Sequence, residues 1–164
     1  MNDRLYFLAA SDIGYGIWKT DGTAGNTVLA VPNVIPYSIN GKQTMSVAGN
    51  NLFFSAITGL TGQQLWKSDG TPAGTGLVKQ ITTNTPTNFS NAVTMGNKLY
   101  FSANDGEHGG ELWSSDGTEA GTNLVKDLNP GNVGSGLNSP KAIYNKLYFS
   151  TTVGDERAVW VSDG

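Results

Sequence analysis

The sequence predicts an all-β fold built from a tandem repeat, and two observations support this prediction. The chain has 164 residues, of which 22 are glycine and only 14% are charged, while 38% are hydrophobic. Gly, Asn, Ser and Thr are abundant and are poor helix formers, whereas the hydrophobic fraction is large enough to build a core. The second observation is that all four tryptophans recur about every 47 residues, which indicates internal repeats.

Each tryptophan lies in the same sequence frame. The frames are IWKTDGT (17–23), LWKSDGT (65–71), LWSSDGT (112–118) and VWVSDG (159–164). An apolar tripeptide precedes each frame, and a Gly- and Thr-rich segment follows the first three. We therefore divide the chain into roughly 3.5 repeats. The expected units are a partial blade 1–31, a blade 32–79, a blade 80–128 and a partial blade 129–164.

Each unit is expected to form four short antiparallel strands joined by tight turns. In the third unit the expected strands are 92–95, 98–103, 111–115 and 122–126. Gly-Asn and Asp-Gly pairs lie between the apolar runs, and these residues tolerate the positive φ of hairpin turns. Aromatic and β-branched residues within the runs favour strands over helices.

The second strand of each unit is apolar on both faces. Leu99 and Phe101 point to one face and Tyr100 to the other, because side chains alternate along a strand. A sheet stacked between two like sheets buries both faces, as in the blades of a β-propeller. A β-solenoid is the alternative architecture.

The two terminal units are expected to be incomplete. By strand role, the first unit lacks its innermost strand and the last unit lacks its outermost strand. Their exposed faces predict that chains self-associate to complete a ring, most simply as a homodimer. The alternative is an engineered or trimmed propeller fragment whose only activity is assembly.

Composition and charge argue against several classes of function. The net charge is −3 and no basic cluster is present, which argues against nucleic-acid binding. No apolar run is long enough for membrane insertion. The chain has no cysteine and a single histidine, and neither a GxSxG motif nor a phosphate-binding loop occurs. We therefore expect no enzyme activity, no catalytic residue, no cofactor and no bound metal.

Two sets of repeated residues are interpreted as structural anchors. The aspartates of the DGT frames are expected to accept hydrogen bonds from local backbone N–H groups, although a ring of carboxylates could instead hold calcium or a polyol. The tryptophans are expected to anchor the packing between blades, with stacking on a sugar ring as the alternative. These anchors are Asp21, Asp69, Asp116, Asp163, Trp18, Trp66, Trp113 and Trp160.

Loops between the second and third strands are the predicted place for ligand contacts, because equivalent loops gather on one rim of a propeller. Polar side chains beside an aromatic ring suit carbohydrate hydroxyl groups. The acidic loop 104–111 also suggests a metal site, but it lacks the EF-hand spacing, and a solvated loop is the favoured interpretation. The candidate ligand-contact residues are Tyr15, Gln63, Gln64, Glu107, His108 and Arg157.

The segment GGELWSSDGTEAGTNLVKDL (109–128) resembles the ELWxxDGT repeat of bacterial proteins. The segment QQLWKSDGTPAGTGLVKQI (63–81) is similar, whereas Gly16 and Ala158 replace the glutamate in the outer units. This resemblance implies a propeller-like module of large secreted or surface proteins, and it supplies no catalytic residues.

We accordingly expect a non-catalytic extracellular module for interaction or scaffolding. Its expected partners are itself and a glycan or another cell-surface partner. A lectin-like carbohydrate-binding propeller is the alternative. The expected location is extracellular or on the cell surface, with the export signal outside this chain.

Overall fold

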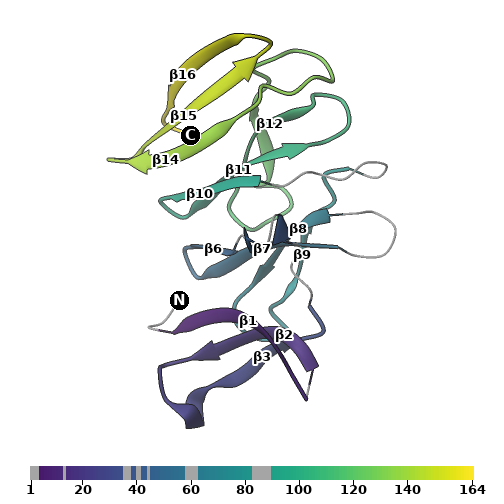
Figure 1. Ribbon diagram of the computed structural model, residues 1–164, viewed down its shortest axis with the longest axis vertical. Helices are drawn as coiled ribbons and strands as arrows, with labels where there is room; N and C mark the ends of the chain where they lie inside the picture. Colours follow the sequence, from purple (N-terminus) through teal and green to yellow (C-terminus); the bar gives the residue numbers. More distant parts are fainter. Residues whose placement is uncertain are drawn as a thin grey trace.

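The computed structural model shows an all-β protein made of small antiparallel sheets stacked along its long axis (Figure 1). The first sheet has the strand order β1-β2-β3, the second β6-β7-β8-β9, the third β10-β11-β12-β13 and the fourth β14-β15-β16. The prediction of repeated antiparallel sheets is confirmed. The structure describes residues 4–12, 14–34, 38–39, 42–43, 45–57, 63–82 and 90–164.

The outer sheets have three strands each and the inner sheets have four. The first sheet contains β1 (Leu5–Ser11), β2 (Gly14–Thr20) and β3 (Val28–Pro32), with the 3-10 turn η1 (Ala24–Asn26) before β3. The second contains β6 (Met45–Ala48), β7 (Asn51–Ile57), β8 (Gln63–Ser68) and β9 (Gly76–Lys79). The third contains β10 (Ser90–Met95), β11 (Lys98–Asn104), β12 (Gly110–Ser115) and β13 (Asn123–Lys126). The fourth contains β14 (Asn138–Ile143), β15 (Lys146–Val153) and β16 (Glu156–Ser162).

The four sheets align by register, so equivalent positions can be compared. In every sheet the Phe that ends the apolar tripeptide pairs with the Trp of the next strand, for example Phe101 with Trp113. The first sheet has no strand equivalent to β6, β10 and β14 among the described residues, and the fourth has none equivalent to β9 and β13. A short hairpin of β4 (Ser38–Ile39) and β5 (Lys42–Gln43), between the first and second sheets, was not predicted.

Hydrophobic clusters fill the spaces between successive sheets. Between the second and third sheets, Phe53 faces Leu99 and Phe101 in one buried cluster. The cluster between the third and fourth sheets contains Tyr100 and Leu147. The second strands of the inner sheets are therefore buried on both faces, as their sequence predicts. Figure 1 shows this stack running from the N-terminal sheet at the bottom to the C-terminal sheet at the top.

The remaining cluster joins the first sheet to the second. Ile17 and Val31 from the first sheet contact Leu52 and Phe54 from the second, and all four are buried. The three clusters repeat one arrangement, in which the second, third and fourth sheets each bury their Leu-and-Phe face against the preceding sheet. In the part of the chain that the structure describes, no helix is long and apolar enough to cross a membrane.

Replacing Trp113 should reveal how much one of these clusters contributes to stability. Trp113 is buried between the second and third sheets, so Trp113→Ala should lower the free energy of unfolding by about 3–5 kcal/mol. The matched control is Trp18→Ala, because Trp18 is equivalent but lies in the terminal sheet and outside all three clusters. Urea denaturation in dilute solution measures both variants, and an equal loss for the two would contradict this packing.

Candidate functional site

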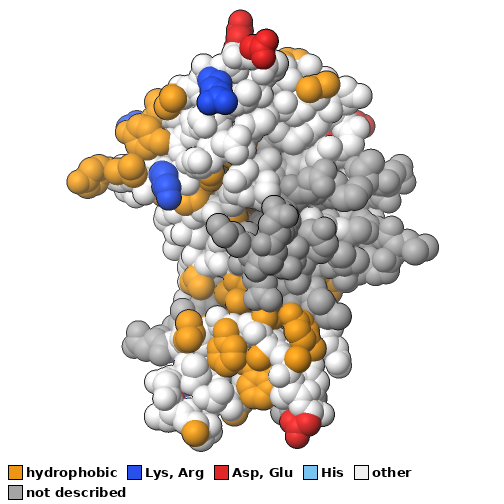
Figure 2. All heavy atoms as spheres, viewed as in Figure 1, with side chains coloured by type: hydrophobic (Ala, Val, Ile, Leu, Met, Phe, Trp, Pro, Cys, Tyr) orange, Lys and Arg blue, Asp and Glu red, His pale blue; other side chains and the backbone are white. Residues whose placement is uncertain are grey.

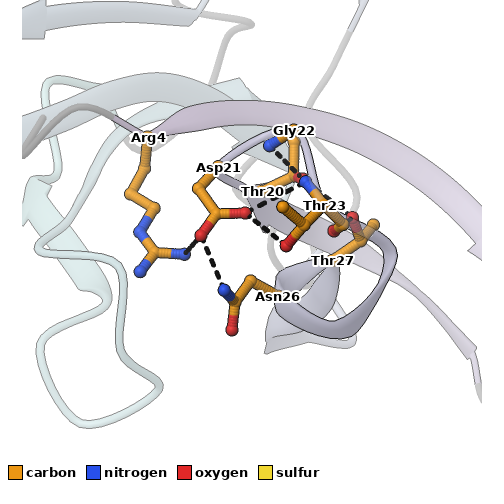
Figure 3. Close-up of polar contacts among 7 residues, drawn as sticks. All are labelled: Arg4, Thr20, Asp21, Gly22, Thr23, Asn26 and Thr27. Carbon is orange, nitrogen blue, oxygen red and sulfur yellow. Dashed lines mark hydrogen bonds and ion pairs between the residues drawn. The ribbon is translucent and has the colours of Figure 1, made fainter.

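The repeated aspartates close the turns that follow the tryptophan strands. In the first turn, Asp21 Oδ1 accepts hydrogen bonds from the Thr23 backbone N–H at 3.0 Å and from the Thr23 hydroxyl at 2.7 Å (Figure 3). Asp69 and Thr71 repeat this pair at 2.9 and 2.7 Å, and Asp116 and Thr118 at 2.8 and 2.7 Å. The local bonding predicted for these three aspartates is thus present.

A chain of hydroxyl groups completes each turn, and sequence reasoning missed it. Gly22 N–H donates to Thr20 Oγ1 at 2.9 Å, which lies 2.7 Å from Thr27 Oγ1. The Thr27 hydroxyl donates to the Thr23 carbonyl, so the Thr20 hydroxyl must donate to Thr27. The same pattern recurs in the next two turns, where Ser68 pairs with Thr75 and Ser115 with Thr122. The sequence signal is a Ser or Thr before each Asp and a Thr six residues after it.

These hydrogen bonds leave the turn carboxylates occupied by their own loops. Hydrogen bonds from the following threonine, first its hydroxyl and then its backbone N–H, lower the pKa of Asp21, Asp69 and Asp116. Asp21 also accepts from Asn26 and lies 3.3 Å from the Arg4 guanidinium (Figure 3). Within the described residues, no three His, Asp or Glu side chains converge on one point.

The acidic loop between β11 and β12 is also internally bonded. Asp105 Oδ1 accepts from the backbone N–H groups of Glu107 and His108, both at 2.9 Å, and Asp105 Oδ2 lies 2.7 Å from His108 Nδ1. The hydrogen bond from the His108 ring to the Asp105 carboxylate is the largest cause that raises the pKa of His108. The loop therefore has the character of a closed Asx turn.

The predicted rim residues do not form one surface. Glu107 and Arg157 are exposed, and Tyr15 and His108 are half-buried. Gln63 and Gln64 were predicted to be exposed, and this is wrong because both are buried. They belong to β8 (Gln63–Ser68), whose two faces are covered by the neighbouring sheets, and not to the predicted loop.

Gln64 and Glu111 instead tie the third strand to the segment that leads to the next sheet. Gln64 Oε1 accepts from the Ile81 N–H at 3.0 Å, and its Nε2 donates to the Thr82 carbonyl at 3.0 Å. Glu111 Oε2 accepts from the Leu128 N–H at 3.1 Å. Glu111 is fully buried, and this burial raises the pKa of its carboxyl group. The glutamate of the repeat motif is therefore a packing residue in this chain.

Three tryptophans lie between sheets, as predicted, and one does not. Trp66, Trp113 and Trp160 belong to the clusters that join successive sheets, whereas Trp18 belongs to the outward face of the first sheet. Trp160 Nε1 donates to Thr151 Oγ1 at 2.9 Å. The buried Nε1 atoms of the other three have no hydrogen-bond partner among the described residues, because alanine stands at the position equivalent to Thr151.

An aromatic ring reaches from each sheet to the Asp-Gly turn of the next sheet. A Cβ atom placed on Gly70 would lie 2.5 Å from the Tyr6 hydroxyl, and one on Gly117 would lie 3.2 Å from Phe53 Cζ. A Cβ on Gly164 would likewise collide with the Tyr100 hydroxyl, which burial and the charge of Asp163 give a raised pKa. The glycines thus permit the turn and leave room for a ring.

The two ends of the stack expose the two halves of this contact. Tyr148, equivalent to Tyr100 and Phe53, is 38% exposed, whereas those two are 3% and 1% exposed. At the other end, a Cβ on Gly22 would meet nothing within 4 Å among the described residues. The described chain therefore presents an unmatched ring at one end and an unmatched glycine turn at the other.

The same holds for the apolar residues around this contact. Leu5, equivalent to the buried Leu52, Leu99 and Leu147, is 65% exposed, and Val159, equivalent to the buried Leu112, is 82% exposed. Figure 2 shows hydrophobic side chains over the N-terminal sheet, and hydrophobic, basic and acidic ones over the C-terminal sheet. We name the outward surface of Leu5, Phe7, Trp18 and Gly22 the N face, and that of Tyr148, Val159 and Val161 the C face.

Replacing Glu111 tests whether its buried carboxyl group makes the stability of the chain depend on pH. Glu111→Gln keeps an acceptor for the Leu128 N–H, as Gln64 does for Ile81, but removes the buried charge. Because the pKa is raised in the folded state, ionisation of Glu111 destabilises the folded chain as pH rises above the ordinary value of 4.5. The variant should be more stable than the parent at neutral pH, and the difference should vanish below that value. Thermal denaturation across this pH range measures it, and a difference independent of pH would contradict the assignment.

A second substitution tests the unpartnered indole N–H of Trp113. Ala103 is equivalent to Thr151, so Ala103→Thr should supply the missing acceptor. Ala103→Val is the control of equal size without a hydroxyl. The threonine variant should exceed the valine variant in unfolding free energy by about 1 kcal/mol. Urea denaturation compares them, and a more stable valine variant would refute the predicted bond.

No protein-family model matches this sequence, and no curated protein matches it either. The candidate site is therefore the pair of exposed end faces, the N face on the first sheet and the C face on the fourth.

Proposed function

We propose that the chain is a non-catalytic, propeller-type repeat scaffold that assembles with its own kind, the C face of one copy binding the N face of the next. One observation carries this proposal. The positions of Leu5 and Phe7 on the N face and of Tyr148 and Val159 on the C face are packed against each other in the three clusters within the chain.

The internal contacts define how the two faces fit. Tyr148 of one copy would lie on Gly22 of the next, as Tyr6 lies on Gly70 and Phe53 on Gly117. Leu5 and Phe7 would pack beneath it, as Leu52 and Phe54 pack against the first sheet. Such an interface is heterologous, because different surfaces meet, and it closes into a ring when the rotation per copy permits. Two copies would be the simplest ring.

The proposed role is extracellular scaffolding or interaction. The similarity of 109–128 to the ELWxxDGT repeat supports this role, and the bonded state of the acidic loop and turn carboxylates argues against chemistry there. A lectin-like function has less support, because Gln63 and Gln64 are buried. Glu107 and Arg157 remain as exposed rim residues for a glycan or cell-surface partner.

Substitution of Tyr148 tests the assembly. Tyr148→Lys places a charge on the C face and should weaken association at least about tenfold, which corresponds to a loss of about 1.4 kcal/mol. Tyr148→Phe is the matched control, because Phe53 fills the equivalent place. Sedimentation velocity measures both, and loss of association in the phenylalanine variant or its retention in the lysine variant would contradict the proposal.

Mixing two variants distinguishes a heterologous interface from a symmetric one. Leu5→Lys blocks the N face and leaves the C face intact, whereas Tyr148→Lys does the reverse. Each variant alone should be monomeric, and an equimolar mixture should form a heterodimer through the one remaining pair of intact faces. Absence of a heterodimer in the mixture would overturn head-to-tail assembly.

A further inference from the structure

One edge of the first sheet differs from the corresponding edge of every other sheet. In the second, third and fourth sheets a first strand pairs antiparallel with the second strand, as β6 does with β7 and β10 with β11. In the first sheet, β1 pairs among the described residues with β2 alone. We name this side of residues 4–8 the open edge. Its backbone N–H and C=O groups offer a template for another strand.

A hollow of about 380 Å³ lies along the open edge. Residues 4–8 line one side, and Met45, Val47 and Leu52 of the second sheet line the other. Val47 is 41% exposed although it faces the first sheet together with its strand partner Leu52. The hollow is therefore a largely apolar groove between two sheets, next to an unpaired strand.

First strands in the other sheets show what fits such a groove. Ala48 of β6 lies in the cluster between the second and third sheets, and Val93 and Met95 of β10 pack on the cluster between the third and fourth. No residue of an equivalent strand contributes to the cluster between the first and second sheets, among the residues described. The groove is at the place where such side chains would pack.

We infer that the open edge of β1 is a docking site for an extended peptide segment that adds as an antiparallel strand. The segment carries apolar side chains at alternate positions, and these fill the groove. By the register of β10 on β11, the residue equivalent to Val93 would lie opposite Tyr6 and the residue equivalent to Met95 opposite Arg4. Backbone pairing would supply affinity and the groove would select the alternate residues.

The occupant is a free segment rather than a folded copy of this chain. Every described first strand is already paired within its own sheet, so a folded copy has no such strand to donate. The site shares Leu5 and Phe7 with the N face, but it also uses Tyr6 and Leu8, which pack on the cluster between the first and second sheets, and Met45, Val47 and Leu52 of the second sheet. The inference does not depend on the proposed self-assembly.

The test uses a fluorescent peptide with the sequence of residues 90–96, SNAVTMG, titrated with the full chain and followed by polarisation. Saturable binding is expected, and a peptide with Val93 and Met95 both replaced by Ser should bind at least about tenfold more weakly. Val47→Lys in the protein should weaken binding of the unmodified peptide by a similar factor. Val133→Lys is the control, because Val133 is 68% exposed and does not line the groove.

The Tyr148→Lys protein separates this site from the assembly interface. It should bind the peptide as the parent does, even though its association is lost. No saturable binding up to about 1 mM protein would overturn the docking site, as would equal binding of the serine peptide or an unchanged affinity in Val47→Lys. Loss of peptide binding in Tyr148→Lys would overturn the separation of the two surfaces.

Discussion

Burial of both faces of one short strand is the constraint on which the structure depends. The Leu-aromatic-Phe run of each second strand places apolar side chains on both sides of a sheet that is only three or four strands wide. Burying each such side chain contributes roughly 1.5–3 kcal/mol to the free energy of folding. A small sheet therefore gains stability when both of its faces are covered. Only another sheet of the same kind offers a matching surface, and stacking follows.

The stacking of the sheets also explains the Asp-Gly turns and the hydrogen bonds of Gln64 and Glu111. The Asp-Gly turns of the second and third sheets must hold a fixed shape, because Gly70 and Gly117 each receive an aromatic ring from the preceding sheet. The aspartate and hydroxyl hydrogen bonds provide that internal support, three times over with almost the same distances. Glu111 and Gln64 then fix the segment that leads from one sheet to the next. The polar residues of the repeat thus serve the packing of the apolar ones.

Much of this architecture could be predicted from the chain itself. The tryptophan frames located the second and third strands because a bulky residue at one fixed place per repeat reflects one fixed environment. The third sheet agrees with its predicted strands to within two residues at each end. The Asp-to-Thr bonds were also predictable, because Asx turns are local and need no knowledge of the tertiary structure.

Contacts between residues that lie far apart in the sequence could not be predicted from the repeat pattern. Gln63 and Gln64 follow the Gly- and Thr-rich sequence TGLTG and were predicted to be exposed, but their burial is decided by the sheets that lie on either side of β8. Gln64 and Glu111 accept hydrogen bonds from the Ile81 and Leu128 N–H groups, each 17 residues further along the chain. The periodicity of the sequence does not predict these pairs. The fit of Tyr6 to Gly70 likewise depends on how two sheets are rotated against each other.

The most direct test of the account is the native mass of the unmodified chain, measured by light scattering during size-exclusion chromatography over a range of concentrations. If like sheets are the only surfaces that cover these faces, the chain forms a closed oligomer of a whole number of copies whose mass does not grow with concentration. A stable monomer at every concentration would contradict the account, because its N and C faces would then persist in water without a partner.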